Sequence, residues 1–137
     1  KQRPGACYDS KECLIGKWWF KGFIDTDSCM VEIPDSVWGV IRWIVLDSTN
    51  FPWIEFFEND SIAGKSVCNK IYGYLMPMYT IGENNTIHWD ISSTDAYCGE
   101  WDARFSSGLG DSEKFVSFRD TLFLYNTHSK MFFVKEE

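Results

Sequence analysis

The feature that most constrains the fold of this chain is a succession of short apolar segments, rich in β-branched and aromatic residues, with turn residues between them. Such segments favour strands, because these side chains suit a pleated, half-buried surface. Their close spacing argues against βαβ units and predicts an antiparallel barrel or a strongly curved antiparallel sheet. The expected strands are 14–25, 29–33, 37–46, 53–57, 62–65, 78–81, 86–91, 114–118, 121–125 and 131–135.

One segment carries a helical period instead. Trp101, Phe105 and Leu109 follow one another at intervals of four residues, which places them on one face of a helix over residues 100–109. Glycines near the end of this segment mark its termination. We therefore expect a mainly β domain with one α-helix packed against the sheet.

Residues 37–46 are apolar on both faces of the expected strand, as in a strand that is covered on both sides. Trp38 and Trp43 are five positions apart, so they cannot share a face of one strand. We therefore expect the two tryptophans in different environments, with at least one of them exposed or covered by a partner.

A length of 137 residues is typical of one domain. We expect residues 1–13, which show no periodicity, to form an N-terminal tail or tether, and residues 14–137 to form a single domain. The formal net charge of −7 and the scattered lysines argue against nucleic-acid binding, which needs neutralisation of phosphates. No apolar run reaches the roughly 18 residues expected of a membrane-spanning helix.

Five cysteines are many for a chain of this length: Cys7, Cys13, Cys29, Cys68 and Cys98. They form no CxxC, and neither histidine lies near a cysteine in the sequence, so a zinc site has little support. Disulfides formed in an oxidising compartment account better for the number. Two bridges among five cysteines can be arranged in about 15 ways, and the sequence does not select one.

The most specific pattern of the chain lies in residues 53–74, where an apolar strand and a turn are followed by Gly64, Cys68-Asn69 and Gly73-Tyr74. This pattern resembles the core motif of the META domain (HslJ-like) family. Further resemblances follow in the family's order: Gly16 and Trp18 in an opening strand, Thr94 and Cys98 in a T-x-x-x-C element, a strand at 120–124 and a closing strand at 131–133. The segment 29–52 is not covered by the resemblance.

The resemblance implies a compact β structure with a packed helix, in a protein of the bacterial periplasm or in a lipoprotein anchored at the outer membrane. Some members of the family are linked to stress, and no enzymatic activity comes with it. A related fold group includes lipid-binding lipoproteins with a cracked barrel. We therefore expect a non-enzymatic protein of the cell envelope that binds a protein partner or a lipid-like ligand and meets the membrane only through a lipid tether in residues 1–13.

The resemblance also bears on Cys68 and Cys98, which match the two cysteine elements of the family. We expect a bridge between them, because cysteines outside the cytoplasm are usually paired. The alternative is a reactive Cys68 thiol, whose activation would need Lys65, Lys70 or His88 nearby.

Four tryptophans are the candidate ligand-binding residues: Trp38, Trp43, Trp53 and Trp89. In a cracked barrel they would line a groove for an acyl chain or another apolar molecule. No nucleophile–base pair and no set of metal ligands stands out in the sequence. We therefore expect no catalytic residues, no metal and no cofactor.

The main alternative is a lipocalin-like carrier of a small hydrophobic molecule, because Gly16-Lys17-Trp18 also fits the Gly-x-Trp start of that fold. A carrier needs a deep cavity, whereas a partner-binding protein shows an exposed aromatic patch without one. An enzyme is the third hypothesis. Its one hint, His88 and Asp90 on the same face of a strand, is more typical of a solvated surface than of a catalytic dyad.

Overall fold

The computed structural model describes residues 6–7, 11–25, 29–39, 41–127 and 129–137. Within these residues, ten strands form one antiparallel sheet, with bounds β1 (Ala6–Cys7), β2 (Gly16–Asp25), β3 (Met30–Glu32), β6 (Trp53–Phe56), β7 (Ile62–Lys65), β8 (Lys70–Gly73), β11 (Ile91–Ser93), β12 (Lys114–Phe118), β13 (Thr121–Tyr125) and β14 (Ser129–Lys135). Hydrogen-bonded neighbours follow the order β1-β12-β13-β14-β2-β6-β7-β8-β11, and β3 pairs with β2 beside this path.

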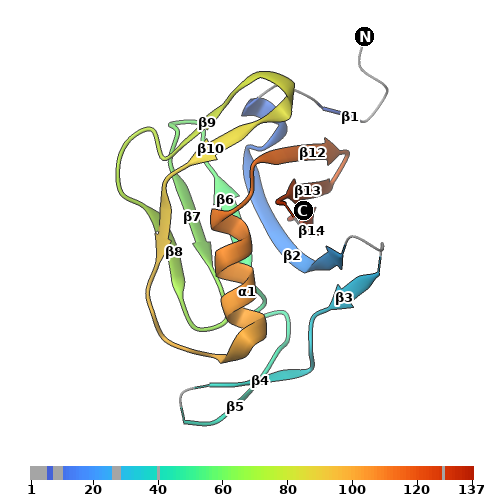
Figure 1. The fold of residues 1–137 in the computed structure, drawn as a ribbon, viewed down its shortest axis with the longest axis vertical. Coiled ribbons are helices and arrows are strands. Elements are labelled where there is room, and N and C mark those ends of the chain that lie inside the picture. The colour runs from blue at the N-terminus through green and yellow to red at the C-terminus, as the bar shows by residue number, and fades with distance from the viewer. Residues whose placement is uncertain (1–5, 8–10, 26–28, 40, 128) are drawn as a thin grey trace.

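The sheet curls around α1 (Gly99–Gly110), which lies between the β6–β8 side and the β12–β14 side (Figure 1). The prediction of a mainly β fold with one packed helix near residues 100–109 is confirmed. A closed barrel is not formed, because β1 and β11 end the order of the described strands without pairing with each other. The helix contacts β11 and lies on the side where a closing strand would be needed.

The core lies between α1 and the sheet and uses inward-facing residues of β2, β6, β7, β8, β12, β13 and β14. Along β2, Trp18 and Phe20 are fully buried, while Trp19 between them points to the opposite face. Phe105 of α1 meets Phe20 edge to face, with ring centroids 4.9 Å apart. Aromatic rings therefore fill the concave side of the sheet, and the buried set also includes Phe23, Phe56, Phe115 and Phe133.

The prediction of one strand over residues 37–46 is wrong. The segment forms a hairpin of β4 (Ser36–Trp38) and β5 (Trp43–Val45), in which the Gly39 amide donates to the Arg42 carbonyl over 2.6 Å. Because Trp38 and Trp43 are cross-strand partners in this hairpin, they share a face, contrary to the expectation for a single strand. Position 40 lies outside the described residues.

A second correction concerns residues 86–91, which alternation predicts as one strand. The chain forms β10 (Ile87–Trp89) and then β11, with a break at Asp90. β10 pairs with β9 (Tyr79–Ile81) in a separate two-stranded sheet, whereas β11 joins the main sheet beside β8. Alternation of side chains continues across such a break, because it does not specify which strand is the partner.

Part of the expected N-terminal tail lies at the edge of the sheet. Ala6 of β1 pairs with Phe118 of β12, and the short helix η1 (Lys11–Cys13) precedes β2. Positions 1–5 and 8–10 lie outside the described residues, and the tether remains a prediction. In the described part of the chain, no helix combines the length and the apolar character needed to cross a membrane.

Candidate functional site

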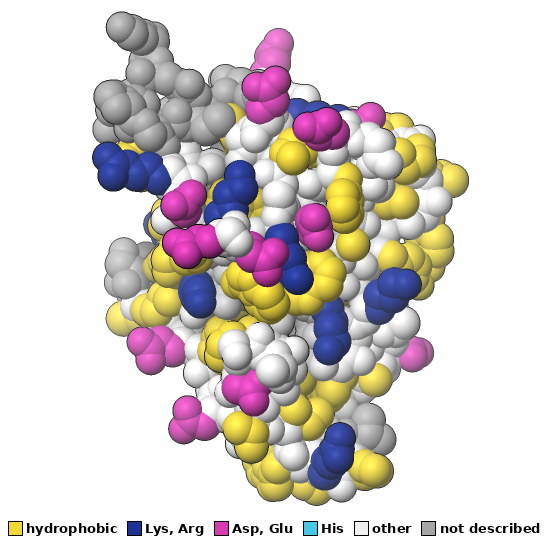
Figure 2. Space-filling model, turned by 180° about the vertical axis from the view of Figure 1, so that it is seen from behind, with side chains coloured by type: hydrophobic (Ala, Val, Ile, Leu, Met, Phe, Trp, Pro, Cys, Tyr) yellow, Lys and Arg dark blue, Asp and Glu magenta, His cyan; other side chains and the backbone are white. Residues whose placement is uncertain are grey.

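The β4–β5 hairpin presents a cluster of exposed hydrophobic side chains, which we name the hairpin patch: Trp38, Ile41, Trp43 and Val45. Their exposed fractions are 49%, 84%, 64% and 67%. The two indole rings lie edge to face, with centroids 5.5 Å apart. The hairpin projects at one end of the molecule, and Figure 2 shows hydrophobic side chains at that end from behind.

The opposite face of the hairpin is anchored in the body of the protein. Val37, which precedes Trp38 and pairs with Ile44, is buried, and it packs in a small cluster with Leu46, Val67 and Cys98. The Leu46 amide donates to the Asp35 carbonyl over 2.9 Å and closes the base of the hairpin. The hairpin patch is therefore held on an anchored support, although its outer face has few neighbours in the described structure.

Beneath the hairpin, Cys68 and Cys98 form the disulfide that the motif resemblance indicates, with their Cα atoms 6.1 Å apart. Cys98 is buried immediately before α1, and Cys68 is partly exposed in the turn before β8. The bridge joins the turn after β7 to the start of the helix. Among the pairings that the sequence leaves open, the fold thus selects this one.

Asn69, beside the disulfide, is a buried structural residue. Its amide Nδ2 donates to the Ala96 carbonyl over 2.7 Å, and its Oδ1 accepts from the Ala96 amide over 2.8 Å and from the Thr94 hydroxyl over 2.9 Å. These bonds tie the turn before β8 to the segment that leads to Cys98. Asn69 bonds to backbone and to a hydroxyl, as a residue that shapes a bend does.

Asp102 is the residue of this region that the sequence reasoning missed. It is buried on α1 and accepts hydrogen bonds from the Val67 amide over 2.6 Å and from the Ser66 hydroxyl over 3.1 Å. Burial raises the pKa of its carboxyl, and these hydrogen bonds oppose the rise. Its position could have been found from the sequence, because 102, 105 and 109 follow the i, i+3, i+7 spacing of a buried helix face.

The remaining motif residues act through packing. A Cβ atom at Gly64 would lie 3.0 Å from the Trp53 carbonyl oxygen, so β7 approaches β6 closely there. At Gly73 a Cβ would lie 2.6 Å from Cγ of Met78, which is the close approach expected for a glycine inside a strand. Tyr74 is exposed and lies edge to face with Tyr72.

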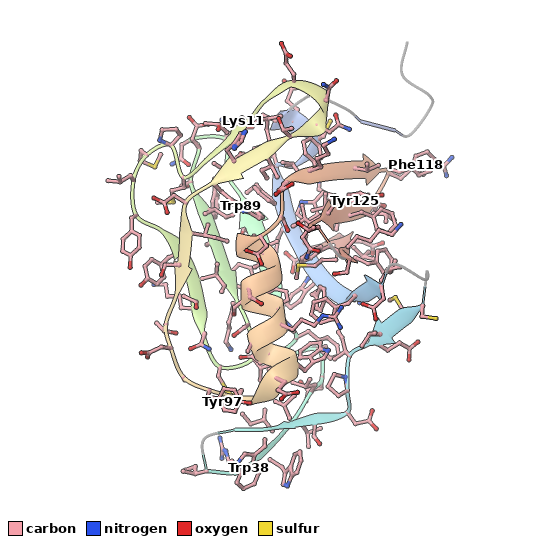
Figure 3. All side chains as sticks on the ribbon, viewed as in Figure 1. Lys11, Trp38, Trp89, Tyr97, Phe118 and Tyr125 are labelled. Atoms are coloured by element: carbon pink, nitrogen blue, oxygen red, sulfur yellow. A yellow bond between two sulfur atoms is a disulfide. The ribbon has the colours of Figure 1, made fainter. Side chains whose placement is uncertain are left out.

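The four candidate tryptophans do not line one groove. Trp89 stacks on Phe56, with ring centroids 5.8 Å apart, and lies at the other end of α1 from Trp38 (Figure 3). Trp53 lies on β6, where its ring and that of Trp19 both contact the Lys17 ammonium, at 4.2 and 4.6 Å. Only Trp38 and Trp43 come together, on the hairpin patch.

Two open clefts flank α1. The larger, of about 890 Å³, lies at its C-terminal end and is lined by Trp89, Arg104 and the exposed His88 among others. The smaller, of about 430 Å³, lies beside β11 and is lined by Cys98 and Asp102 among others. Both are surface clefts, and neither is the deep interior cavity of a carrier.

Cys68, Cys98 and Asp102 bring two sulfurs and a carboxylate oxygen within 4.8 Å of one another. This is a possible donor set for a metal ion, but the two sulfurs are bonded to each other in the disulfide. In this oxidised state the group is a disulfide next to a buried acid.

Comparison of the chain with protein-family models, with curated proteins and with solved structures finds no match.

Proposed function

We propose that this chain is a non-enzymatic binding protein of the bacterial cell envelope, which docks on a hydrophobic surface of a protein partner through the hairpin patch. The observation that carries the proposal is the exposed Trp38–Trp43 pair on an anchored hairpin. Aromatic side chains exposed together cost solubility, and in interfaces they supply much of the binding energy.

The packing of the interior favours a docking protein over a lipocalin-like carrier. The concave side of the sheet, where a carrier would hold its ligand, contains Trp18, Phe20 and Phe105, all fully buried. The clefts beside α1 are open to solvent and mix polar with apolar groups. A ligand-enclosing cavity would have to displace these rings.

The cell-envelope assignment is supported by the Cys68–Cys98 bridge, because disulfides persist in oxidising compartments. It is supported further by the resemblance of Gly64, Cys68-Asn69 and Gly73-Tyr74 to the META domain motif, which we retain as a hypothesis. The periplasm or the outer-membrane surface, reached by a lipid tether, is the proposed location.

Site-directed photo-crosslinking in bacterial cells tests the proposal. A photoreactive phenylalanine analogue placed at Val45 should form a discrete protein adduct, and the Trp38→Ser/Trp43→Ser double variant should lose it. The same analogue at Thr80, exposed on β9 at the other end of the molecule, is the matched control. Identical adducts from both positions, or an adduct that survives the double variant, would count against docking through the hairpin patch.

Native mass spectrometry separates this function from the carrier alternative. The purified protein should show the mass of the chain alone after incubation with envelope lipids. A bound apolar molecule that is retained in the native spectrum and lost on denaturation would instead support a carrier.

A further inference from the structure

The Cys68–Cys98 disulfide has one accessible and one buried sulfur-bearing residue. Cys98 is 1% exposed, whereas Cys68 is partly exposed at the surface turn before β8. Thiol–disulfide exchange requires a thiolate to reach one sulfur of the bond, and access decides which sulfur is attacked. Cys68 is therefore the more exposed of the two cysteines, and we expect an external thiol to attack its sulfur.

A buried acid lies next to this bond. The Asp102 carboxylate, the Cys68 sulfur and the Cys98 sulfur lie within 4.8 Å of one another. Its hydrogen bonds from Ser66 and Val67 hold the carboxyl in place. Because burial raises the pKa of Asp102, this carboxyl exchanges a proton closer to neutral pH than an ordinary aspartate does.

The acid also has a route to solvent. Asp102 and Cys98 line the 430 Å³ cleft beside β11, so solvent in this cleft borders both residues. The other titratable side chains that line this cleft are Asp95 and Tyr97, and both are exposed. The turn that packs on Asp102 contributes hydrogen-bond donors from residues 66–69 and no charge.

We propose that Cys68–Cys98 is a thiol-exchange site, at which an external thiol forms a mixed disulfide with Cys68 and Asp102 carries the proton of Cys98. This inference does not depend on docking through the hairpin patch. The chemical class of its partner is a thiol, either a small molecule or a cysteine of another protein.

Each step conserves atoms and electrons. An external thiolate attacks the Cys68 sulfur, a new S–S bond forms, and the electron pair of the old bond leaves on Cys98, which takes the proton of Asp102. A second external thiolate then attacks the external sulfur of the mixed disulfide and releases Cys68 as a thiolate. The external thiols are oxidised to their disulfide while the cysteine pair is reduced, so no further oxidant or reductant is needed.

The expected difference in reactivity between Cys68 and Cys98 is tested with variants that lack one of the two cysteines and with oxidised glutathione. Cys98→Ser leaves Cys68 alone, and Cys68→Ser leaves Cys98 alone. Glutathione should add to Cys68 on the order of tenfold faster than to Cys98, measured by peptide mapping so that the other cysteines do not interfere. Equal rates in variants that keep the tryptophan emission of the folded protein would overturn the assignment of Cys68.

A second test uses the wild-type protein and does not depend on whether the cysteine variants fold. Reduced glutathione should open the Cys68–Cys98 bond under native conditions, as followed by alkylation of the released Cys98 thiol after the samples are quenched and unfolded. Asp102→Asn should slow opening on the order of 10²-fold and remove an inflection from its pH profile, and Asp102→Glu should restore part of the rate. A merely structural role predicts the opposite, because looser packing speeds reduction.

The two sources of thiol are distinguished by repeating the assay with a cysteine-containing peptide of neutral charge. Faster reaction with the peptide than with glutathione assigns the site to protein cysteines, and the reverse assigns it to small thiols. A bond that stays closed to both reagents while the protein remains folded would show that the disulfide is purely structural and overturn the proposal.

Discussion

Two buried polar side chains, Asn69 and Asp102, hold the loops around the disulfide in place. The amide of Asn69 bonds both the N–H and the carbonyl of Ala96, in the irregular segment that leads to α1. Asp102 does the same for the amide of Val67. Each side chain thus replaces the backbone pairing that an irregular segment cannot supply, and loss of Asp102 would leave the amide of the buried Val67 without this partner.

Asp102 predicts a specific pH dependence of stability. Since burial raises its native pKa above the unfolded value of about 3.8, the folded state binds this proton more tightly. The stability that Asp102 contributes is therefore fully present below about pH 3.8 and is lost as the pH rises through the raised pKa. The free energy of unfolding of the wild type, relative to Asp102→Asn, should fall with rising pH in that window in urea titrations.

Asp47 provides a control of opposite sign. Hydrogen bonds from Thr49 lower the pKa of its exposed carboxyl, so the stability it contributes is present at neutral pH and lost as the pH falls through the lowered pKa. The free energy of unfolding of the wild type, relative to that of Asp47→Asn, should therefore increase with rising pH. If the stability difference between wild type and variant changed with pH in the same direction for Asp102→Asn and Asp47→Asn, the assignment of the Asp102 effect to burial would be contradicted.

At the scale of the element, the β4–β5 hairpin places buried and exposed side chains on its two opposite faces. Its inner face carries Val37 and its outer face carries Trp38 and Trp43, because neighbouring residues of a strand point to opposite sides. The inner face is needed for folding, and the outer face is available for binding. This division allows the hairpin patch to be changed without loss of the fold.

Substitutions on the two faces should therefore differ. Val37→Ala removes buried methyl groups from the cluster around Cys98, and should lower the free energy of unfolding by about 2 kcal/mol. Trp38→Ala removes a half-exposed ring and one edge-to-face contact with Trp43, which we expect to cost about 1 kcal/mol. Chemical denaturation of both variants measures the difference, and a larger loss for Trp38 would mean that the tryptophan pair supports the fold.

Over the whole molecule, α1 covers the concave face of the curved sheet and completes the hydrophobic core. The helix inserts Phe105 and Leu109 against the concave side, where both are fully buried. The sheet can therefore stay open between β1 and β11 and still cover its apolar face. The helix thus shields the apolar face of the sheet from solvent, which additional strands do in a closed barrel.

Phe105 tests this arrangement. Phe105→Ala should destabilise the protein by about 3–5 kcal/mol, because it opens a cavity next to Phe20 that the surrounding rings cannot fill. Phe118→Ala, on β12 and 42% exposed, should cost less than about 1 kcal/mol and is the matched control. Thermal or urea unfolding checks both. Similar losses would contradict the central place of α1 in the core.

The local features of the fold could be predicted from the sequence. Strands β2, β6, β7, β12 and β13 begin and end close to their predicted bounds, and the stripe of Phe105 and Leu109 indicates α1. These features follow from side-chain periods of 2 and 3.6, which depend only on neighbours along the chain. Turn residues such as those at 58–61 mark where such segments end.

Only the tertiary structure decided which segments meet. The apolar run at 37–46 reverses without a strong turn signal, so the pairing of Trp38 with Trp43 could not be read from alternation. The tertiary fold also brings Asp102 to Cys68 and Cys98, from segments that are about 30 residues apart in sequence. Such contacts depend on how the sheet curls around α1, and that is a property of the whole core rather than of any one stretch of sequence.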